Sequence, residues 1–324
     1  MRDYWRLIRW QNLLFLGILI WVMEKWVATP LLEAIRFGEV LPWWLLVLLI
    51  IASICTAAGG YIINDYFDVK IDRINRPDKL IVTQTISKDQ AMWLYRIVTA
   101  IGVISGLVTA WIVRSMPLAI IYIIVPGLLW FYSSSYKRQL ILGNLIVAFV
   151  SAIAPLIVAL TNVAYLEKHF AMVMPYLSIQ HDLMVWLGAF ALFAFLTTWI
   201  REIIKDLQDQ AGDRELECHT LPIVWGETWT KVIVTLLLLI TAGLIAWIGF
   251  GVLPFAHNWM SLTCRYIVFG LFIPLACEIW LLWAARIPSE YRHAQLLMKF
   301  IMFLGVLFAF VIKTTLPATI TILQ

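Results

Sequence analysis

Residues 41–73 read LPWWLLVLLIIASICTAAGGYIINDYFDVKIDR, and this stretch decides the fold. It stays mostly apolar from Leu41 to Ile63, which is long enough for a helix to cross the roughly 30 Å hydrocarbon core of a bilayer. Asn64 follows, and three aspartates then appear at the spacing Asp-x-x-Asp-x-x-x-Asp. The stretch therefore predicts a membrane-spanning helix that ends in an acidic motif.

Apolar runs of similar length recur along the whole chain of 324 residues. Hydrophobic residues make up 62% of the chain and charged residues 14%, whereas a soluble domain has about 45–50% and about 25%. We therefore expect an all-α polytopic membrane protein, with residues 1–324 forming a single domain in one helical bundle. The basic N-terminal segment leads into the first span without a small-residue cleavage site, so no signal peptide is expected. The nine expected spans are about 11–28, 43–66, 91–113, 116–134, 141–163, 183–204, 231–252, 262–284 and 295–320.

The same acidic spacing returns after the sixth expected span, at Asp206, Asp209 and Asp213. On a helix, offsets of three and seven residues place three carboxylates within an arc of about 60°. We expect Arg76-Pro77 to end the helix that carries the first motif, because the residue before a proline is pushed out of the α region. Gly212 is expected to loosen or end the helix of the second motif in the same way.

Basic residues predict the orientation of the chain in the membrane. Most of the 24 Lys and Arg residues lie in the N-terminal segment and in the loops after expected spans 2, 4, 6 and 8. The positive-inside rule places these segments in the cytoplasm, with the N-terminus inside and the C-terminus outside. Both acidic motifs fall on this cytoplasmic side. We expect an integral protein of a bacterial or archaeal cell membrane, with no nucleic-acid partner and no obligate protein partner.

The two motifs are candidate metal ligands. Six carboxylates at one membrane face would repel one another unless a counterion held them. Mg²⁺ suits such a set, because it takes oxygen ligands and completes its shell with water and substrate phosphates. Asn64, Asp68 and Asp72 can share one ion while Asp65 supports them from the edge. The alternative is that the aspartates simply cap and solvate helix ends. The candidate metal ligands are Asn64, Asp65, Asp68, Asp72, Asp206, Asp209 and Asp213.

Cationic and polar residues near the motifs are candidate contacts for a polyphosphate. Arg201 and Lys205 lie one turn apart ahead of the second motif, at a depth where charges usually face a polar cavity. They are the best candidates for holding pyrophosphate oxygens. Positive-inside bias accounts equally well for the other cations, and interhelical hydrogen bonding for the polar residues. These further candidates are Arg73, Arg76, Lys79, Lys137 and Arg138, with Asn12, Tyr132, Ser133 and Asn144.

The chain resembles the UbiA superfamily of intramembrane prenyltransferases. The run from Asn64 to Asp72 matches that family's Asn-Asp-x-x-Asp-x-x-x-Asp motif, and the run from Asp206 to Asp213 matches its second motif. Arg76-Pro77, Tyr132-Ser133, Lys137-Arg138 and Asn12 are similar to further family features. The resemblance implies about nine spans and the transfer of a prenyl group from an isoprenyl diphosphate to a lipophilic acceptor. It implies two Mg²⁺ ions held between the motifs and the diphosphate, and catalytic roles for Asp68, Asp72, Asp209, Asp213 and Lys205.

Within that family the chain is most similar to the branch that prenylates geranylgeranylglyceryl phosphate. The resemblance rests on NDYFDVKIDRINRPDK, on REIIKDLQDQAGDR and on Thr220-Leu221-Pro222. The loop from Asp78 to Thr85 departs from the Pro-Ser-Gly turn usual in that branch. A glycerol-phosphate lipid acceptor is therefore favoured, with an aromatic acceptor of quinone or pigment biosynthesis as the alternative. A cation-coupled transporter and a lipid-binding protein are alternatives of other classes.

Overall fold

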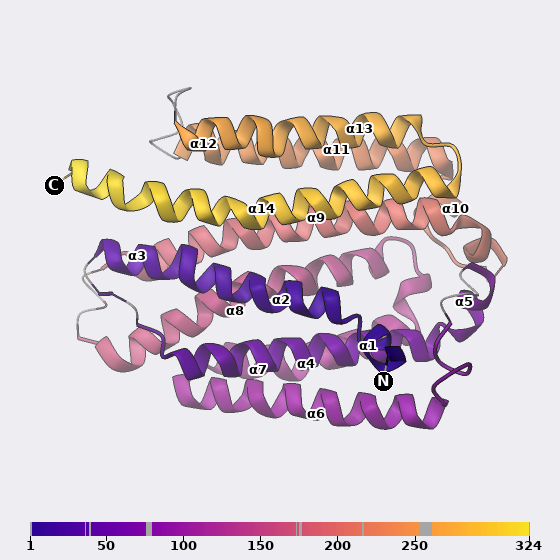
Figure 1. The fold of residues 1–324 in the computed structure, drawn as a ribbon, viewed down its shortest axis with the longest axis horizontal. Helices are drawn as coiled ribbons and strands as arrows, with labels where there is room; N and C mark the ends of the chain where they lie inside the picture. Colours follow the sequence, from indigo (N-terminus) through magenta and orange to yellow (C-terminus); the bar gives the residue numbers. More distant parts are fainter. Residues whose placement is uncertain are drawn as a thin grey trace.

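The computed structural model describes residues 2–35, 37–38, 40–75, 80–172, 174, 177–215, 217–252 and 261–323, with the side chains of residues 71, 74, 75, 138, 252 and 316–323 excepted. In these ranges the chain is almost entirely helical and has no strand beyond one isolated bridge, between Val82 and Ile86. The helices lie side by side along one long axis (Figure 1). The expected all-α class is confirmed.

The described residues form nine helical segments long and apolar enough to cross a membrane, as expected. Each follows from an apolar run. The long helices are α4 (Trp43–Phe67), α6 (Lys88–Val113), α7 (Met116–Ser134), α8 (Leu142–Phe170), α9 (Ile179–Glu215), α11 (Gly226–Ala246) and α14 (Pro288–Leu323). The first span is assembled from α2 (Trp10–Val22), the π-helix η1 (Met23–Ala28) and α3 (Thr29–Ala34). The eighth is assembled from α12 (Leu262–Arg265), η6 (Tyr266–Phe272) and α13 (Ile273–Ala284), and η5 (Trp247–Val252) extends α11.

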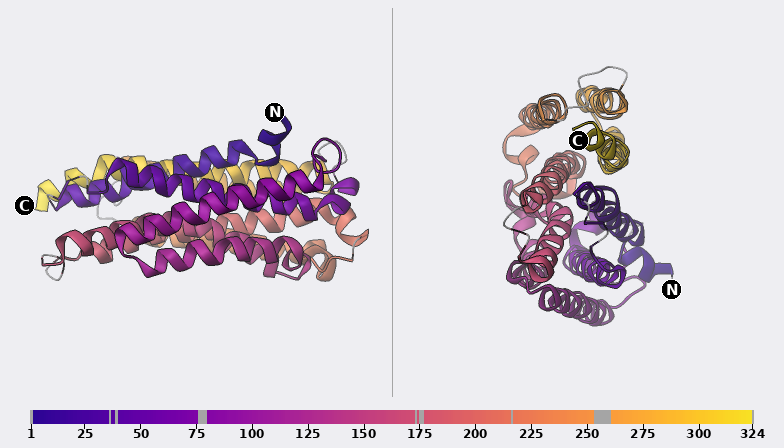
Figure 2. Two further views of the ribbon diagram at one scale, coloured as in Figure 1. Left: turned by 90° about the horizontal axis from the view of Figure 1, so that it is seen from below. Right: turned by 90° about the vertical axis from the view of Figure 1, so that its left-hand side faces the viewer.

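The short elements outside the spans gather at one end of the bundle. The elements α1 (Arg2–Leu7), α5 (Val69–Asn75), η3 (Tyr136–Arg138) and α10 (Leu221–Val224) complete the described secondary structure. Figure 1 places α1, α5 and α10 at one end and the C-terminus at the other. Seen along the bundle, the orange and yellow C-terminal helices gather at one side, and the magenta helix α6 lies at the opposite side (Figure 2).

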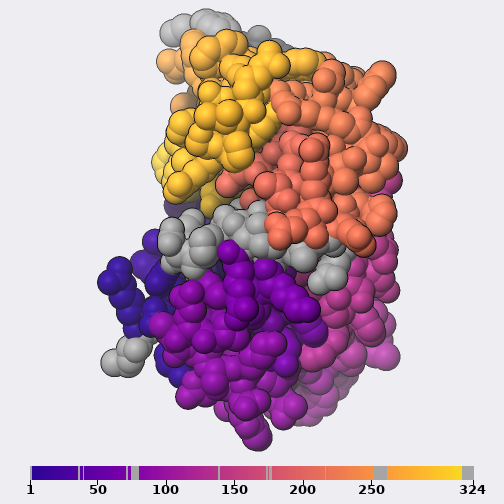
Figure 3. Space-filling view, turned by 90° about the vertical axis from the view of Figure 1, so that its right-hand side faces the viewer, coloured from indigo at the N-terminus to yellow at the C-terminus, as the bar shows by residue number. Residues whose placement is uncertain are grey.

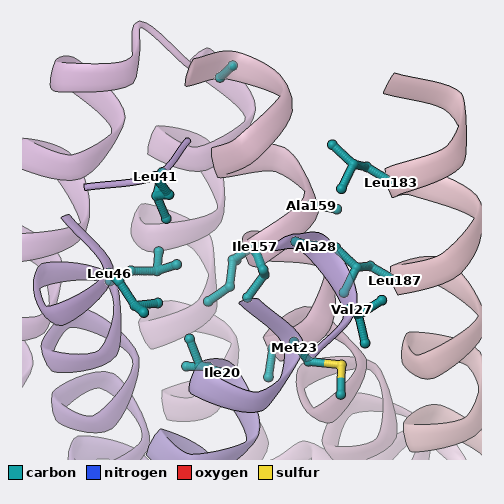
Figure 4. Packing of buried hydrophobic residues seen from close by; sticks show 14 of the residues in the cluster. Ile20, Met23, Val27, Ala28, Leu41, Leu46, Ile157, Ala159, Leu183 and Leu187 are labelled. Atoms are coloured by element: carbon teal, nitrogen blue, oxygen red, sulfur yellow. The ribbon is translucent and has the colours of Figure 1, made fainter. Parts of the chain in front are cut away.

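Three apolar clusters hold these helices together. The largest joins the N-terminal spans to α8 and α9, where Ile20, Met23, Leu46, Ile157 and Leu187 pack closely (Figure 4). A second joins α9 to α11, α13 and α14. A third lies at the end that carries the acidic motifs and packs the segment after α5 against α4 and α6. Helix α9 belongs to the first two clusters, so it links the two halves of the bundle.

Helix α9 corrects one expectation from the sequence. It runs without interruption from Ile179 to Glu215, so Gly212 neither loosens nor ends it. A glycine inside a helix costs only about 1 kcal/mol relative to alanine. Helix α9 recovers this cost because it packs against α5 and α10 at this level, where Gly212 and Asp213 are both buried. The second motif therefore lies entirely on one helix.

The first motif spans a kink. Helix α4 ends at Phe67, Asp68 adopts φ −84° and ψ 0°, and α5 begins at Val69. The ladder nevertheless continues, because the Asp68 amide donates to the Asn64 carbonyl and the Asp72 amide to the Asp68 carbonyl, each at 2.9 Å. Helix α5 ends at Asn75, next to the expected stop at Arg76-Pro77, but residues 76–79 lie outside the described part of the chain.

Candidate active site at one end of the bundle

Asp68 lies at the centre of the first motif's contacts. Its carboxylate forms an ion pair with Lys137, which the turn of η3 after α7 presents. The Asn64 amide donates to the other Asp68 oxygen at 2.7 Å. The side chains of Asp68 and Lys137 are only 14% and 13% exposed, so solvent screens this pair weakly. The structure thus brings together Asp68 of the first motif and Lys137, which was predicted to contact a polyphosphate.

Asp65 contacts a different element, the segment between α1 and α2. Arg9 donates to Asp65 at 2.9 Å and lies over the Tyr61 ring, 4.8 Å from its centroid. Burial acts against the charge of Arg9, but Asp65 and Tyr61 outweigh it, so the pKa of Arg9 is raised. Asn12 donates to the Tyr61 hydroxyl at 3.3 Å. Asp65 and Asp68 therefore have separate cationic partners, and sequence reasoning missed Arg9.

The second motif is held by neutral donors. Asn144, at the start of α8, donates to Asp206 at 2.7 Å. Thr220, just before α10, donates to Asp213 at 3.2 Å. These bonds orient the two carboxyl groups. Oxygen ligands held in this way are suited to a hard divalent cation.

Arg201 and Lys205 share one carboxylate that sequence reasoning missed. Glu202 forms an ion pair with Arg201, and its other oxygen lies 3.8 Å from the Lys205 amine. The Glu202 side chain is 6% exposed, against 22% for Arg201 and 37% for Lys205. The signal was available, because a carboxylate inside an apolar span is expected to have a partner there.

The two motifs meet at the same end of the bundle. Asp213 lies near enough to Asp209 and Asp68 for their charges to interact, and α5 packs against α9. Tyr132, at the end of α7, interacts electrostatically with Asp68 of the first motif and Asp206 of the second, and also with Lys205 and Glu202. Figure 3 looks onto this end, where violet and orange parts of the chain, far apart in sequence, both reach the surface. The convergence of two sequence-distant motifs is the main finding at this site.

Several predicted residues add little to this picture. Arg73 is exposed on α5, and Asp72 is half-buried there with its amide bonded to Asp68. Ser133 is buried, with its hydroxyl bonded to the Leu129 carbonyl, so it serves α7 itself. Arg76, Lys79 and the side chain of Arg138 lie outside the described residues. Their predicted roles stay predictions.

The donor set fits a hard divalent cation better than a thiophilic metal. The converging groups offer carboxylate and amide oxygens, with no cysteine or histidine among the candidate ligands. No group of three or more His, Cys, Asp or Glu side chains among the described residues is arranged to hold a metal ion alone. The site therefore suits an ion that also draws on water and substrate oxygens.

Comparison with known proteins gives one consistent result. A profile of the UbiA prenyltransferase family matches residues 26–313. A digeranylgeranylglyceryl phosphate synthase from Thermococcus gammatolerans is 28% identical over 96% of this chain and 98% of its own length. One of the same name from Methanosphaera stadtmanae is 30% identical over 60% of this chain, and the match covers 63% of that relative.

Solved structures agree on the fold. A structure described as giving insight into digeranylgeranylglyceryl phosphate synthase in membranes superposes with a TM-score of 0.63 at 22% identity, covering 96% of both chains. A UbiA homologue from Archaeoglobus fulgidus, bound to GPP and Mg²⁺, gives 0.54 at 16% identity over 95% of this chain and 99% of its own. At these identities the likeness establishes the architecture alone.

Proposed function

This chain belongs to the UbiA prenyltransferase family, and on that premise we propose that it transfers a prenyl group from an isoprenyl diphosphate to a glycerol-phosphate lipid. The observation that carries the proposal is the convergence of both aspartate motifs, with Lys137, Arg201 and Lys205, at one end of the bundle. A cluster of acidic oxygens flanked by fixed cations is the chemistry that a metal–diphosphate pair needs. The family assignment favours this enzyme over the transporter alternative.

Mg²⁺ is the cofactor that fits the donor set, and two ions would match the two motifs. Asp68 and Asp72 with Asn64, and Asp209 and Asp213 with Asp206, would hold it. When bound, Mg²⁺ supplies Lewis-acid stabilisation of the charge that develops on the departing diphosphate. The UbiA homologue solved with GPP and Mg²⁺ supports this assignment.

The protein's own cations complete the stabilisation of the leaving group. Lys137, Arg201 and Lys205 are anchored by Asp68 and Glu202, so they are fixed before substrate arrives. Preorganised cations that need no rearrangement at the moment of reaction are the most effective electrostatic catalysts. We assign them to the diphosphate oxygens. Further proposed contacts of the substrate are Asn12, Arg73, Arg76, Lys79, Tyr132 and Arg138.

A lipid acceptor is supported by the curated relatives, which are named for a glycerol-phosphate product. The loop from Asp78 to Thr85 differs in sequence from the branch of the family that the chain most resembles, and the structure describes this loop from Leu80 onward. Ile81, Val82 and Ile86 pack into the apolar cluster at the motif end, so this loop is a packed part of the end of the bundle. An aromatic acceptor is the second candidate.

The proposal extends to the whole chain and its orientation. We propose that residues 1–324 act as one catalytic domain with the site at the cytoplasmic face. The motifs and the N-terminal segment share one end of the bundle and the C-terminus lies at the other (Figure 1). Labelling of single cysteines placed at each end, in intact cells, tests the orientation.

Product analysis tests the reaction. Purified protein with Mg²⁺ is given C10 to C20 prenyl diphosphates and a panel of glycerol-phosphate and aromatic acceptors, and the products are identified by mass spectrometry. We expect prenylated glycerol phosphate. Prenylation of an aromatic acceptor alone would overturn the acceptor assignment, and the absence of any prenylated product would overturn the proposed function.

A further inference from the structure

The end of the bundle opposite the acidic motifs contains a pocket with both apolar and cationic lining residues. A cavity of about 650 Å³ lies where α6 turns into α7 beside the last turns of α8. Its lining includes Trp111, Arg114, Ser115, Met116 and Lys168. No acidic side chain belongs to this lining among the described residues. Two cations thus face a space large enough for a small polar group, without a carboxylate in its lining.

The polar groups of the pocket have unused hydrogen-bonding capacity. Lys168 donates to the Ile112 carbonyl at 2.6 Å, which leaves two of its three ammonium donors. The Arg114 guanidinium has no ion-pair partner within the described residues. Ser115 is only 8% exposed, yet its hydroxyl caps no backbone amide of α7. Helix α7 begins at the same point, so the positive end of its dipole lies there. Pro117 has no amide hydrogen, so the amides of Met116 and Leu118 are the first donors.

Two apolar side chains that line the pocket are exposed. Trp111 is 81% exposed and Met116 is 71% exposed. Tryptophan at the end of a membrane span typically marks the boundary between lipid tails and headgroups. Two exposed cations beside exposed apolar side chains match an amphipathic ligand better than a soluble one.

From these observations we infer that the α6–α7 turn binds the phosphate of an anionic membrane lipid. The phosphodiester is held by Arg114, Lys168 and Ser115 with the α7 amides, and the lipid tails lie along Trp111 and Met116. The site is separate from the acidic motifs, so its occupancy does not depend on the proposed reaction.

The turn offers a variant that removes charge without damaging the fold. Arg114 has φ +59° and ends α6 in the left-handed conformation, which glycine adopts more readily than any other residue. Arg114→Gly therefore removes the guanidinium and relieves backbone strain, whereas Arg114→Lys keeps the charge. Lys168→Met removes the second cation. Lys313→Met is the matched control, because Lys313 is exposed in the C-terminal part of α14, away from this pocket.

Native mass spectrometry of full-length, delipidated protein provides the test. The protein is titrated with phosphatidylglycerol, with phosphatidylcholine and with inorganic phosphate as a competitor. We expect one tightly bound phosphatidylglycerol, a loss of affinity of roughly tenfold for Arg114→Gly and for Lys168→Met, and wild-type binding for Arg114→Lys and Lys313→Met. Equal phosphatidylglycerol binding by wild type, Arg114→Gly and Lys168→Met would overturn the site. Displacement of the lipid by equimolar phosphate would overturn the lipid as its ligand.

Discussion

Replacing Glu202 by glutamine should lower the free energy of unfolding of the ligand-free protein and increase its affinity for pyrophosphate. The amide keeps the shape of the side chain and removes its charge. Glu202 is 6% exposed and forms ion pairs with both Arg201 and Lys205. At 3.8 Å the Lys205 pair alone has a Coulomb attraction of about 4 kcal/mol at an effective dielectric constant of 20, before desolvation and ordering costs.

The net loss of stability is smaller than that attraction. Removing one partner of a fully buried pair costs roughly 3–5 kcal/mol, and an exposed pair contributes about 0–1 kcal/mol. The partners here are 22% and 37% exposed, so we expect the free energy of unfolding to fall by roughly 1–3 kcal/mol. The two cations then face an incoming anion without their carboxylate. Loss of one negative charge several ångströms from a phosphate should tighten pyrophosphate binding about fivefold, a gain of about 1 kcal/mol.

Thermal unfolding in detergent, measured against pyrophosphate concentration, separates these two effects. Without ligand, Glu202→Gln should have a lower melting temperature than wild type. Its melting temperature should then rise more steeply with pyrophosphate, because ligand stabilisation grows as the dissociation constant falls. Glu215→Gln, an exposed change on the same helix, is the matched control and should follow wild type. The reasoning is refuted if Glu202→Gln is as stable as wild type without ligand, or if pyrophosphate stabilises it less.

Three further changes test the packing and the site. Gly106→Ala would place a methyl group against the ring atoms of Tyr122, so the free energy of unfolding should fall by roughly 1–3 kcal/mol. In contrast, Gly127→Ala lies inside α7 and meets nothing within 4 Å, so it should raise the free energy of unfolding by roughly 0.5–1 kcal/mol. Glu278 is fully buried, and within the described part of the chain neither of its carboxylate oxygens has a hydrogen-bond partner. Glu278→Met should therefore raise the melting temperature by an amount equivalent to roughly 1–3 kcal/mol, and a fall would show that Glu278 stabilises the fold. Asn144→Leu removes a donor to a second-motif carboxylate and should lower stability by roughly 1.5–3 kcal/mol, and an unchanged denaturation curve would contradict the importance of that bond.

The spans could be predicted because each long apolar run has one stable solution in a bilayer, a helix with all its backbone bonds satisfied internally. Helix ends were harder to predict. Gly212 reads as a stop in the sequence, but its small helical cost is outweighed by packing of α9 against α5 and α10. Local signals alone therefore misplace an end that tertiary contacts decide.

The candidate site, too, could be predicted from the sequence only in part. Repeated spacing identified the aspartates, because three- and seven-residue offsets share a helix face whatever surrounds them. The partners of those aspartates depend on which elements meet in space. Arg9 reaches Asp65 from a segment 56 residues away, and Lys137 reaches Asp68 across 69 residues. Pairings over such separations follow from the bundle's topology, which the motifs do not encode.

The most direct test of the central claim is Mg²⁺-dependent consumption of a labelled C20 prenyl diphosphate by the purified protein with a glycerol-phosphate lipid acceptor. We expect wild type and the exposed-site control Asp89→Asn to turn over, and chelation of Mg²⁺ to stop both. Asp68→Ala and Asp209→Ala should each lower turnover by at least about a hundredfold, the order of loss when one preorganised electrostatic group is removed. Wild-type turnover in both aspartate variants would contradict the claim that the two converging motifs form the catalytic site.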